Sequence, residues 1–265
     1  MMMTPDFVEG NHIWIHRLDA FGFDDVVDML LEHCDTPEHQ GKVIVLGAYI
    51  HHPVSYFRQL YPNRKVVIYQ LEQMVGSETW HPVSRIVEHL RGADEIWDLD
   101  PLNATFLSWR DVHVDRILPM RYTRALERIA LEPEPSIDVL FYGYLNERRF
   151  RIVRQLEQQL YNRIKLVWLY GVTGNELDRY IADAKIILNL HAFEPWNRQE
   201  QVRIFYPVIN GRLVVSEVSE YNAFGDAIVE VEAERLGDTL LHWLAEDRWR
   251  SRGLAGQQLF RQLGA

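Results

Sequence analysis

Short apolar runs of strand length alternate with amphipathic helical patterns along most of the chain. The runs are nearly continuous in apolar residues, which is typical of strands that are covered on both faces of a parallel sheet. They lie at 12–15, 43–48, 66–71, 95–97, 117–119, 137–142, 165–170, 185–190, 213–216 and 227–231. Helical patterns fill the intervals at 22–33, 53–60, 82–91, 102–108, 147–160, 174–183, 198–206 and 234–262. This order predicts an α/β protein built from doubly wound, Rossmann-like sheets.

The strand series is interrupted at the sequence ALEPEPS, residues 130–136, where two prolines lie among charged residues. The chain has 265 residues, which is enough for two domains of ordinary size. We therefore predict an N-terminal domain over 1–133 and a C-terminal domain over 134–265, facing each other across a cleft. The last helix is expected to be free to pack back on the first domain.

The composition favours a globular protein and excludes several classes. Hydrophobic residues make up 47% and aromatic residues 12%, which supports a packed core. The net charge of −10 disfavours a nucleic-acid partner. No apolar run approaches the ~20 residues of a membrane span, and the N-terminus does not resemble a signal peptide, so we expect a cytoplasmic protein. The single cysteine, Cys34, excludes a disulfide framework and a multi-cysteine metal site.

Ionisable side chains follow two predicted strands of the first half. In an open parallel sheet, ligands bind beyond the carboxyl ends of the strands. His51 and His52 follow the strand at 43–48, and Glu72 follows the strand at 66–71. Each is a candidate general base facing an acceptor, since histidine titrates near neutrality and a carboxylate can accept a proton. A hydrogen-bonded structural role is the alternative for the histidines.

The second half opens with a candidate anion site in the sequence DVLFYGYLNERRFRIVRQL, residues 138–156. A strand ends at Gly143, and a helix with Arg148 and Arg149 begins after Asn146. Glycine permits close backbone approach, a helix N-terminus presents unpaired N–H groups, and guanidinium groups bind phosphate oxygens. An ordinary strand–helix unit with surface arginines is the alternative.

Later strand ends of this half add candidate donor-binding residues at the expected edge of the sheet. These are Gly171, Asn189 and His191, of which the histidine is a candidate contact to a sugar or a phosphate. Trp196, in the following loop, is a candidate for lining a sugar site. The second half thus offers candidate phosphate-binding residues, and the first half offers ionisable residues. This combination suits group transfer from a phosphorylated donor.

Three segments of the second half resemble the donor domain of the GT-B glycosyltransferases in order and spacing. They are DVLFYGYLNERR (138–149), AKIILNLHAFE (184–194) and QEQVRIFYPVINGRLVVSE (199–217). The likeness is closest to the small bacterial polysaccharide-type enzymes, and the first half matches only loosely, through VVIYQLEQ (66–73) and EIWDLDPLN (95–103). The resemblance implies transfer of a sugar from a nucleotide-sugar to a polysaccharide, lipid-linked sugar, protein or modified nucleobase, with no cofactor.

The sequence departs from the family where retaining members carry two glutamates eight positions apart. The corresponding positions hold Arg198 and Tyr206. Glu200 and Arg203, one helical turn apart, are candidates to take over the ribose or phosphate contacts. The absent pair leaves the stereochemistry open. Two alternatives to a transferase therefore stay open: a nucleotide-sugar epimerase of the same build, and a non-catalytic nucleotide-sugar-binding subunit of a larger complex.

The sequence Asp98-Leu99-Asp100 resembles the metal-binding motif of the other large glycosyltransferase fold. Asp100 precedes Pro101 at the start of a helical pattern, and aspartate followed by proline is a common helix start. We therefore predict that Asp100 caps a helix and that donor binding needs no metal, because arginines would hold the diphosphate. No G-x-G-x-x-G or Walker loop is present, which disfavours a nicotinamide dehydrogenase or a P-loop enzyme.

Overall fold

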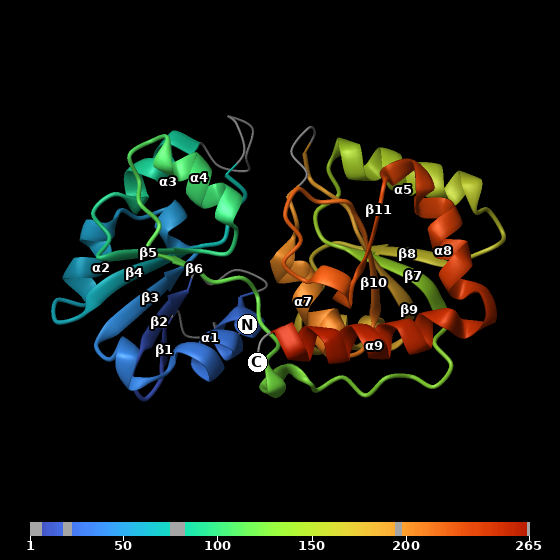
Figure 1. The fold of residues 1–265 in the computed structure, drawn as a ribbon, viewed down its shortest axis with the longest axis horizontal. Helices are drawn as coiled ribbons and strands as arrows, with labels where there is room; N and C mark the ends of the chain where they lie inside the picture. The colour runs from blue at the N-terminus through green and yellow to red at the C-terminus, as the bar shows by residue number, and fades with distance from the viewer. Residues whose placement is uncertain (1–6, 18–22, 75–82, 194–197, 264–265) are drawn as a thin grey trace. The chain divides into compact units, whose positions relative to one another are not determined.

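The computed structural model describes residues 7–17, 23–74, 83–193 and 198–263, which divide into two compact units. The first unit is Met1–Met120 and the second is Arg121–Ala265. Each unit contains one β-sheet with helices packed against it (Figure 1). The predicted pair of α/β units with parallel sheets is therefore confirmed. Among the described residues, no helix combines the length and the apolar character that crossing a membrane would require.

The sheet of the first unit has the strand order β1-β2-β3-β4-β5-β6. Its strands are β1 (Phe7–Glu9), β2 (Trp14–Arg17), β3 (Lys42–Leu46), β4 (Lys65–Gln70), β5 (Glu95–Asp98) and β6 (Arg116–Ile117). Its helices are α1 (Asp24–Cys34), α2 (Val54–Leu60), α3 (Val83–Leu90) and α4 (Pro101–Ser108). All neighbouring strands are parallel except β1 and β2. The antiparallel strand β1 was not expected, because three residues carry too little pattern.

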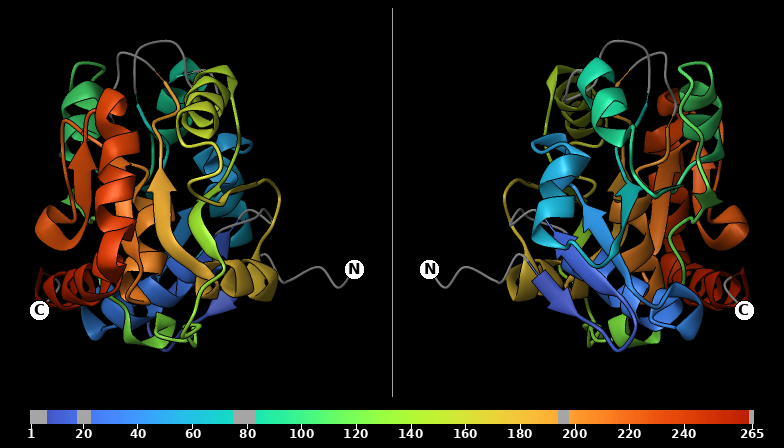
Figure 2. Two further views of the ribbon diagram at one scale, coloured as in Figure 1. Left: turned by 90° about the vertical axis from the view of Figure 1, so that its right-hand side faces the viewer. Right: turned by 90° about the vertical axis from the view of Figure 1, so that its left-hand side faces the viewer.

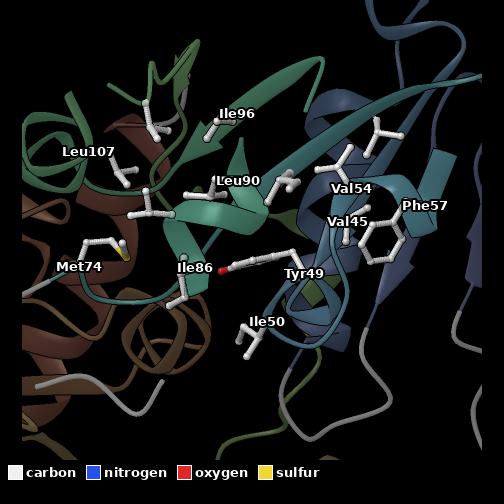
Figure 3. Packing of buried hydrophobic residues seen from close by; sticks show 14 of the residues in the cluster. Val45, Tyr49, Ile50, Val54, Phe57, Met74, Ile86, Leu90, Ile96 and Leu107 are labelled. Atoms are coloured by element: carbon white, nitrogen blue, oxygen red, sulfur yellow. The ribbon is translucent and has the colours of Figure 1, made fainter. Parts of the chain in front are cut away.

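Helices α2 and α3 enclose one core of this unit against the middle strands. Val45, Tyr49, Phe57 and Ile86 are buried there, with Tyr49 crossing between the aliphatic side chains (Figure 3). The hydroxyl of Tyr49 donates a hydrogen bond to Oε1 of Gln70 at 2.9 Å. Tyr49 therefore connects this core to Gln70, the last residue of β4, through a hydrogen bond.

A buried aspartate continues that polar network. Asp98 accepts hydrogen bonds from Nε2 of Gln70 and Nδ2 of Asn103, each at 3.0 Å. Burial raises the pKa of Asp98, and the hydrogen bonds it accepts oppose the shift. The Asp100 carboxylate accepts from the backbone N–H of Leu102 at 2.8 Å, which confirms it as the cap of α4. Both carboxylates thus serve the fold of this unit.

The second unit has a five-stranded sheet in the order β11-β10-β9-β7-β8, with parallel neighbours throughout. Its strands are β7 (Ile137–Tyr142), β8 (Leu166–Leu169), β9 (Ala184–Asn189), β10 (Leu213–Glu217) and β11 (Val229–Val231). Its helices are α5 (Glu147–Gln159), α6 (Gly174–Ala182), α7 (Gln201–Ile209), α8 (Leu236–Leu244) and α9 (Arg248–Leu263). Helices lie on both faces of the sheet (Figure 2).

The last part of the chain differs from the single helix predicted over 234–262. Helices α8 and α9 are separated at Glu246 and Asp247, both of which have φ of 54°. Helix α9 then packs against β10 and α7 of its own unit. Gly253 and Gly256 allow this approach, since a Cβ at either position would collide with a backbone carbonyl oxygen. The predicted single helix is thus wrong, and α9 buries its small-residue face inside the second unit.

The segment before the proline-rich stretch belongs to the second unit rather than to the first. Oδ1 of Asn210 accepts hydrogen bonds from the backbone N–H groups of Arg128 (3.1 Å) and Ile129 (3.0 Å). Nε of Arg128 also donates to the Tyr206 hydroxyl at 2.9 Å. The division therefore falls at Met120, ahead of the expected boundary at 133. These side-chain contacts to α7 are long-range and leave no local sequence signal.

Candidate functional site

The carboxyl ends of β7, β9 and β10 bring the predicted donor-side residues of the second unit together. Because these strands are parallel, their ends meet at one edge of the sheet. Hydrogen bonds and ion pairs at this edge connect Asn146, Arg148, Arg149, His191, Glu200 and Glu217. The candidate site is therefore a polar cluster between the start of α5, the end of β9 and the start of α7.

Asn146 fixes the beginning of α5. Its Oδ1 accepts a hydrogen bond from the backbone N–H of Arg149 at 2.9 Å, so this residue, expected among the donor-binding residues, caps the helix. Its Nδ2 donates to the carbonyl of Ala192, beyond the end of β9. Asn146 therefore anchors this helix start to the neighbouring strand end.

Arg148 forms a two-pronged ion pair with Glu217. Nη1 and Nη2 of the arginine lie 2.8 and 2.6 Å from the two carboxylate oxygens, and Nη1 also donates to the carbonyl of His191. Glu217 is only 3% exposed and additionally accepts from the His191 backbone N–H at 2.7 Å. Arg148 thus connects α5 to the ends of β9 and β10.

Arg149 is buried in the same cluster, with a residue exposure of 1%. Its Nε donates to the carbonyl of Leu190 (3.0 Å), Nη1 to that of Tyr144 (2.9 Å), and Nη2 to Oε1 of Glu200 (2.6 Å). Burial lowers the pKa of Arg149 to about 10, and the Glu200 carboxylate opposes this shift. The arginines that the sequence suggested for phosphate binding are both engaged with protein acceptors.

Arg203 lies differently, with its guanidinium directly over the backbone of Gly143. Gly143 has φ of +128°, and a Cβ there would come within 2.7 Å of Nη2 and 2.9 Å of Cζ of Arg203. The Arg203 side chain is 16% exposed, and its Nη2 is 3.9 Å from Oε2 of Glu200. Nη1 of Arg203 is buried and has no hydrogen-bond partner among the residues that the structure describes. The guanidinium therefore covers the Gly143 backbone with Nη2, Cζ and Nε, while its Nη1 has no protein acceptor among the described residues.

The close approach predicts different costs for alanine at two glycines with positive φ. Gly143→Ala should lower the free energy of unfolding by about 1–3 kcal/mol or more, because backbone strain adds to the collision with Arg203. Gly171→Ala is the matched control, since Gly171 has φ of +71° but no atom within 4 Å of an added Cβ. Urea unfolding of the two variants measures the difference. Equal losses would mean that Arg203 moves aside without cost.

Asn189 and His191 are enclosed by protein. Asn189 is fully buried at the end of β9, and its Nδ2 donates to Oγ of Ser216 at 3.0 Å. His191 is 1% exposed, and its two ring nitrogens lie 2.8 and 3.0 Å from the carbonyl oxygens of Arg198 and Val218. The His191 ring therefore connects loops after β9 and β10.

Arg198 and Tyr206 occupy the positions where retaining GT-B enzymes carry glutamates, and both contact other parts of the protein. The Tyr206 hydroxyl donates to Oδ1 of Asp178 at 2.6 Å and accepts from Nε of Arg128, so it joins α7 to α6 and to the segment before the proline-rich stretch. Arg198 is buried, with its carbonyl oxygen beside His191. Trp196 lies outside the described residues. Glu200 and Arg203 are thus the charged pair that α7 brings to the strand ends.

The candidate base residues of the first unit all follow the carboxyl ends of its central strands. His51 and His52 lie exposed after β3, and the His52 ring stacks on Tyr56 with centroids 4.3 Å apart. Glu72 lies two residues after β4, and its carbonyl oxygen accepts from Nε2 of Gln70 (2.7 Å) and Nδ2 of Asn103 (3.0 Å). The buried Asp98 network therefore fixes the backbone of Glu72.

Sequence reasoning did not indicate which charged groups would pair. Arg148 and Glu217 are 69 positions apart, and Arg149 and Glu200 are 51 apart. It also missed an aromatic contact between Tyr144 and Tyr170, which follow β7 and β8. The position of each residue just beyond an apolar strand was the available signal.

Comparisons with known proteins find a likeness in fold alone. No family model and no curated protein matches the sequence. Among solved structures, TarM has a TM-score of 0.58 at 11% identity, with 84% of this chain and 52% of TarM covered. HepE from Anabaena in complex with UDP-glucose gives 0.55 at 12%, covering 84% and 74%. A glycosyltransferase from Rickettsia africae gives 0.50 at 11%, covering 94% and 80%. The chain thus spans about half the length of TarM.

Proposed function

The protein has the GT-B glycosyltransferase fold, and on that premise we propose that it transfers a sugar from a nucleotide-sugar to a hydroxyl acceptor. The donor would bind at the carboxyl ends of β7, β9 and β10. The acceptor class is a glycan, a lipid-linked sugar, a protein or a modified nucleobase. A solved complex of HepE with UDP-glucose supports the choice of a nucleotide-sugar.

The observation that carries the proposal is the placement of the Arg203 guanidinium over Gly143. A diphosphate needs a positive charge and hydrogen-bond donors at close range, and a glycine permits the backbone to approach. The Arg203 guanidinium lies over Gly143 and its Nη1 has no protein acceptor among the described residues, whereas Arg148 and Arg149 are held by Glu217 and Glu200. We therefore assign the direct phosphate contact to Arg203 and a supporting role to Arg148 and Arg149.

In the proposed reaction, the bond between the sugar's anomeric carbon and the diphosphate oxygen breaks. The acceptor oxygen bonds to the same carbon, and its proton passes to a base or to the leaving group. Arg203 stabilises the charge that develops on the departing nucleoside diphosphate. We propose that Glu200, whose Oε2 is 3.9 Å from Nη2 of Arg203, orients that guanidinium and accepts a hydrogen bond from the ribose.

Arg203→Ala tests the proposal directly. It should weaken the binding of UDP, GDP or ADP, whichever the wild-type protein binds, by about 10- to 150-fold, the effect of losing a charge-assisted hydrogen bond of about 1.5–3 kcal/mol. Calorimetric titration gives the affinities. Arg151→Ala is the control, because Arg151 lies on the exposed side of α5. Wild-type affinity in the Arg203 variant would contradict the assignment, and a wild-type protein that binds none of the three would contradict the function.

Turnover with a nucleotide-sugar should persist in excess EDTA. Arg203 and the N-terminus of α5 are the proposed counter-charges, so a divalent ion has no required position. Asp98 and Asp100 are already bonded to donors within the first unit. Release of free nucleoside diphosphate is measured with and without the chelator. Activity lost in EDTA and restored by manganese or magnesium would contradict this prediction.

The same assay separates the remaining alternatives. A transferase releases free nucleoside diphosphate faster when an acceptor is supplied. An epimerase changes the sugar without releasing the nucleotide, and a binding subunit leaves the donor unchanged. Product analysis by mass spectrometry and NMR distinguishes these three results.

A further inference from the structure

Two exposed tyrosines lie immediately beside the proposed diphosphate position. Tyr144 follows Gly143 and Tyr170 follows β8, and their ring centroids are 5.7 Å apart at an interplanar angle of 68°. The two residues are 48% and 66% exposed. The pair thus presents aromatic surface to solvent at the edge of the sheet where the candidate site is formed.

The backbone fixes this pair relative to Gly143. The N–H of Gly143 donates to the carbonyl of Leu169 at 3.0 Å, which joins the ends of β7 and β8. Each tyrosine is one residue beyond that bond. The carbonyl of Tyr144 is additionally held by Nη1 of Arg149 at 2.9 Å. The buried arginine therefore positions the residue that carries the ring, while the ring itself stays exposed.

We propose that the Tyr144–Tyr170 pair is the platform on which the nucleobase of the donor stacks. This inference rests on the proposed function, because it assumes that a nucleoside diphosphate is bound beside Gly143. In a nucleoside diphosphate, a single ribose separates the base from the diphosphate. A base whose diphosphate is bound beside Gly143 would therefore lie close enough to stack on a neighbouring aromatic ring. Every nucleobase has a flat π-face, and stacking on an aromatic side chain is tolerant of base identity.

The other exposed aromatic residues of this unit have different surroundings. Phe150 and Trp168 come from α5 and β8 and are 49% and 44% exposed, but neither directly follows the bond between Gly143 and Leu169. Tyr161 is 74% exposed but lies beyond the far end of α5, next to a surface hollow lined by Arg154, Glu157 and Lys165. Tyr161 is therefore a matched control for removing an exposed tyrosine.

Titrations with UDP, GDP and ADP, and displacement of the bound nucleotide by inorganic pyrophosphate, test the platform. Tyr170→Ala should weaken binding of the nucleoside diphosphates by about 5- to 150-fold, the effect of losing one stacked base. Pyrophosphate affinity should stay within about two-fold, since it has no base to stack. Tyr170→Phe should bind as the wild type does, and Tyr161→Ala should leave all affinities unchanged.

Three results would overturn the inference. If Tyr144→Ala and Tyr170→Ala both bind nucleoside diphosphates like the wild type while Arg203→Ala does not, the base lies elsewhere and the proposed function stands. If Tyr170→Ala weakens pyrophosphate as much as the nucleotides, the tyrosine supports the diphosphate site rather than the base. If the wild-type protein binds none of the nucleotides, the inference falls together with the proposed function.

Discussion

Arg149→Ala should lower the free energy of unfolding by about 3–5 kcal/mol, the usual cost of removing one partner of a buried ion pair. The residue is 1% exposed and donates to Leu190, Tyr144 and Glu200. Alanine would remove the guanidinium donors from the carbonyl oxygens of Leu190 and Tyr144 and from the Glu200 carboxylate. Urea unfolding followed by circular dichroism measures the loss.

Arg149→Lys and Arg151→Ala complete this test. Lysine keeps the charge but cannot reach three acceptors in the fixed geometry of a guanidinium, so an intermediate loss is expected. It also gives a result if the alanine variant does not fold. Arg151 is exposed on the same helix, and its replacement should change stability by no more than about 0.5 kcal/mol. An Arg149→Ala protein of normal stability that binds UDP poorly would restore Arg149 as a direct phosphate ligand.

Glu72→Gln should reduce kcat for sugar transfer by about 10²- to 10⁴-fold, the typical contribution of a general base. Glutamine has nearly the same shape but cannot accept the acceptor's proton. We choose Glu72 among the three candidates because Gln70 and Asn103 donate hydrogen bonds to its backbone carbonyl. A catalytic group must be held in position by its neighbours. Affinity for the nucleoside diphosphate should not change, because the proposed donor site lies in the other unit.

His51→Ala and His52→Ala provide the comparison. Both histidines are exposed at the same edge of the first sheet, so their replacement should not disturb folding. A large loss of kcat at either histidine, with Glu72→Gln active, would move the base to that residue. If no variant loses more than a few-fold in kcat, the first unit does not supply a base. A retaining mechanism without an enzymic base, or a protein that only binds the donor, would then be favoured.

Local sequence patterns predicted most of the secondary structure because they depend on which residues must be buried. The runs at 43–48, 66–71 and 137–142 appear as β3, β4 and β7 within one or two residues. Capping residues were equally readable, since Asn146 and Asp100 begin helices as expected. Predictions failed where burial gave no signal. The three residues of β1 and the break at Glu246 and Asp247 are examples.

The two largely parallel α/β sheets, and the edge at which polar residues collect, could be predicted because hydrophobic periodicity and strand ends are local properties of the chain. Which arginine remains available to a ligand could not be predicted in this way. Glu217 and Glu200 come from distant positions and engage Arg148 and Arg149, while Arg203 lies over Gly143 and its Nη1 has no protein acceptor among the described residues. Charge pairing depends on distances across the folded sheet, and no pattern along the chain specifies those distances.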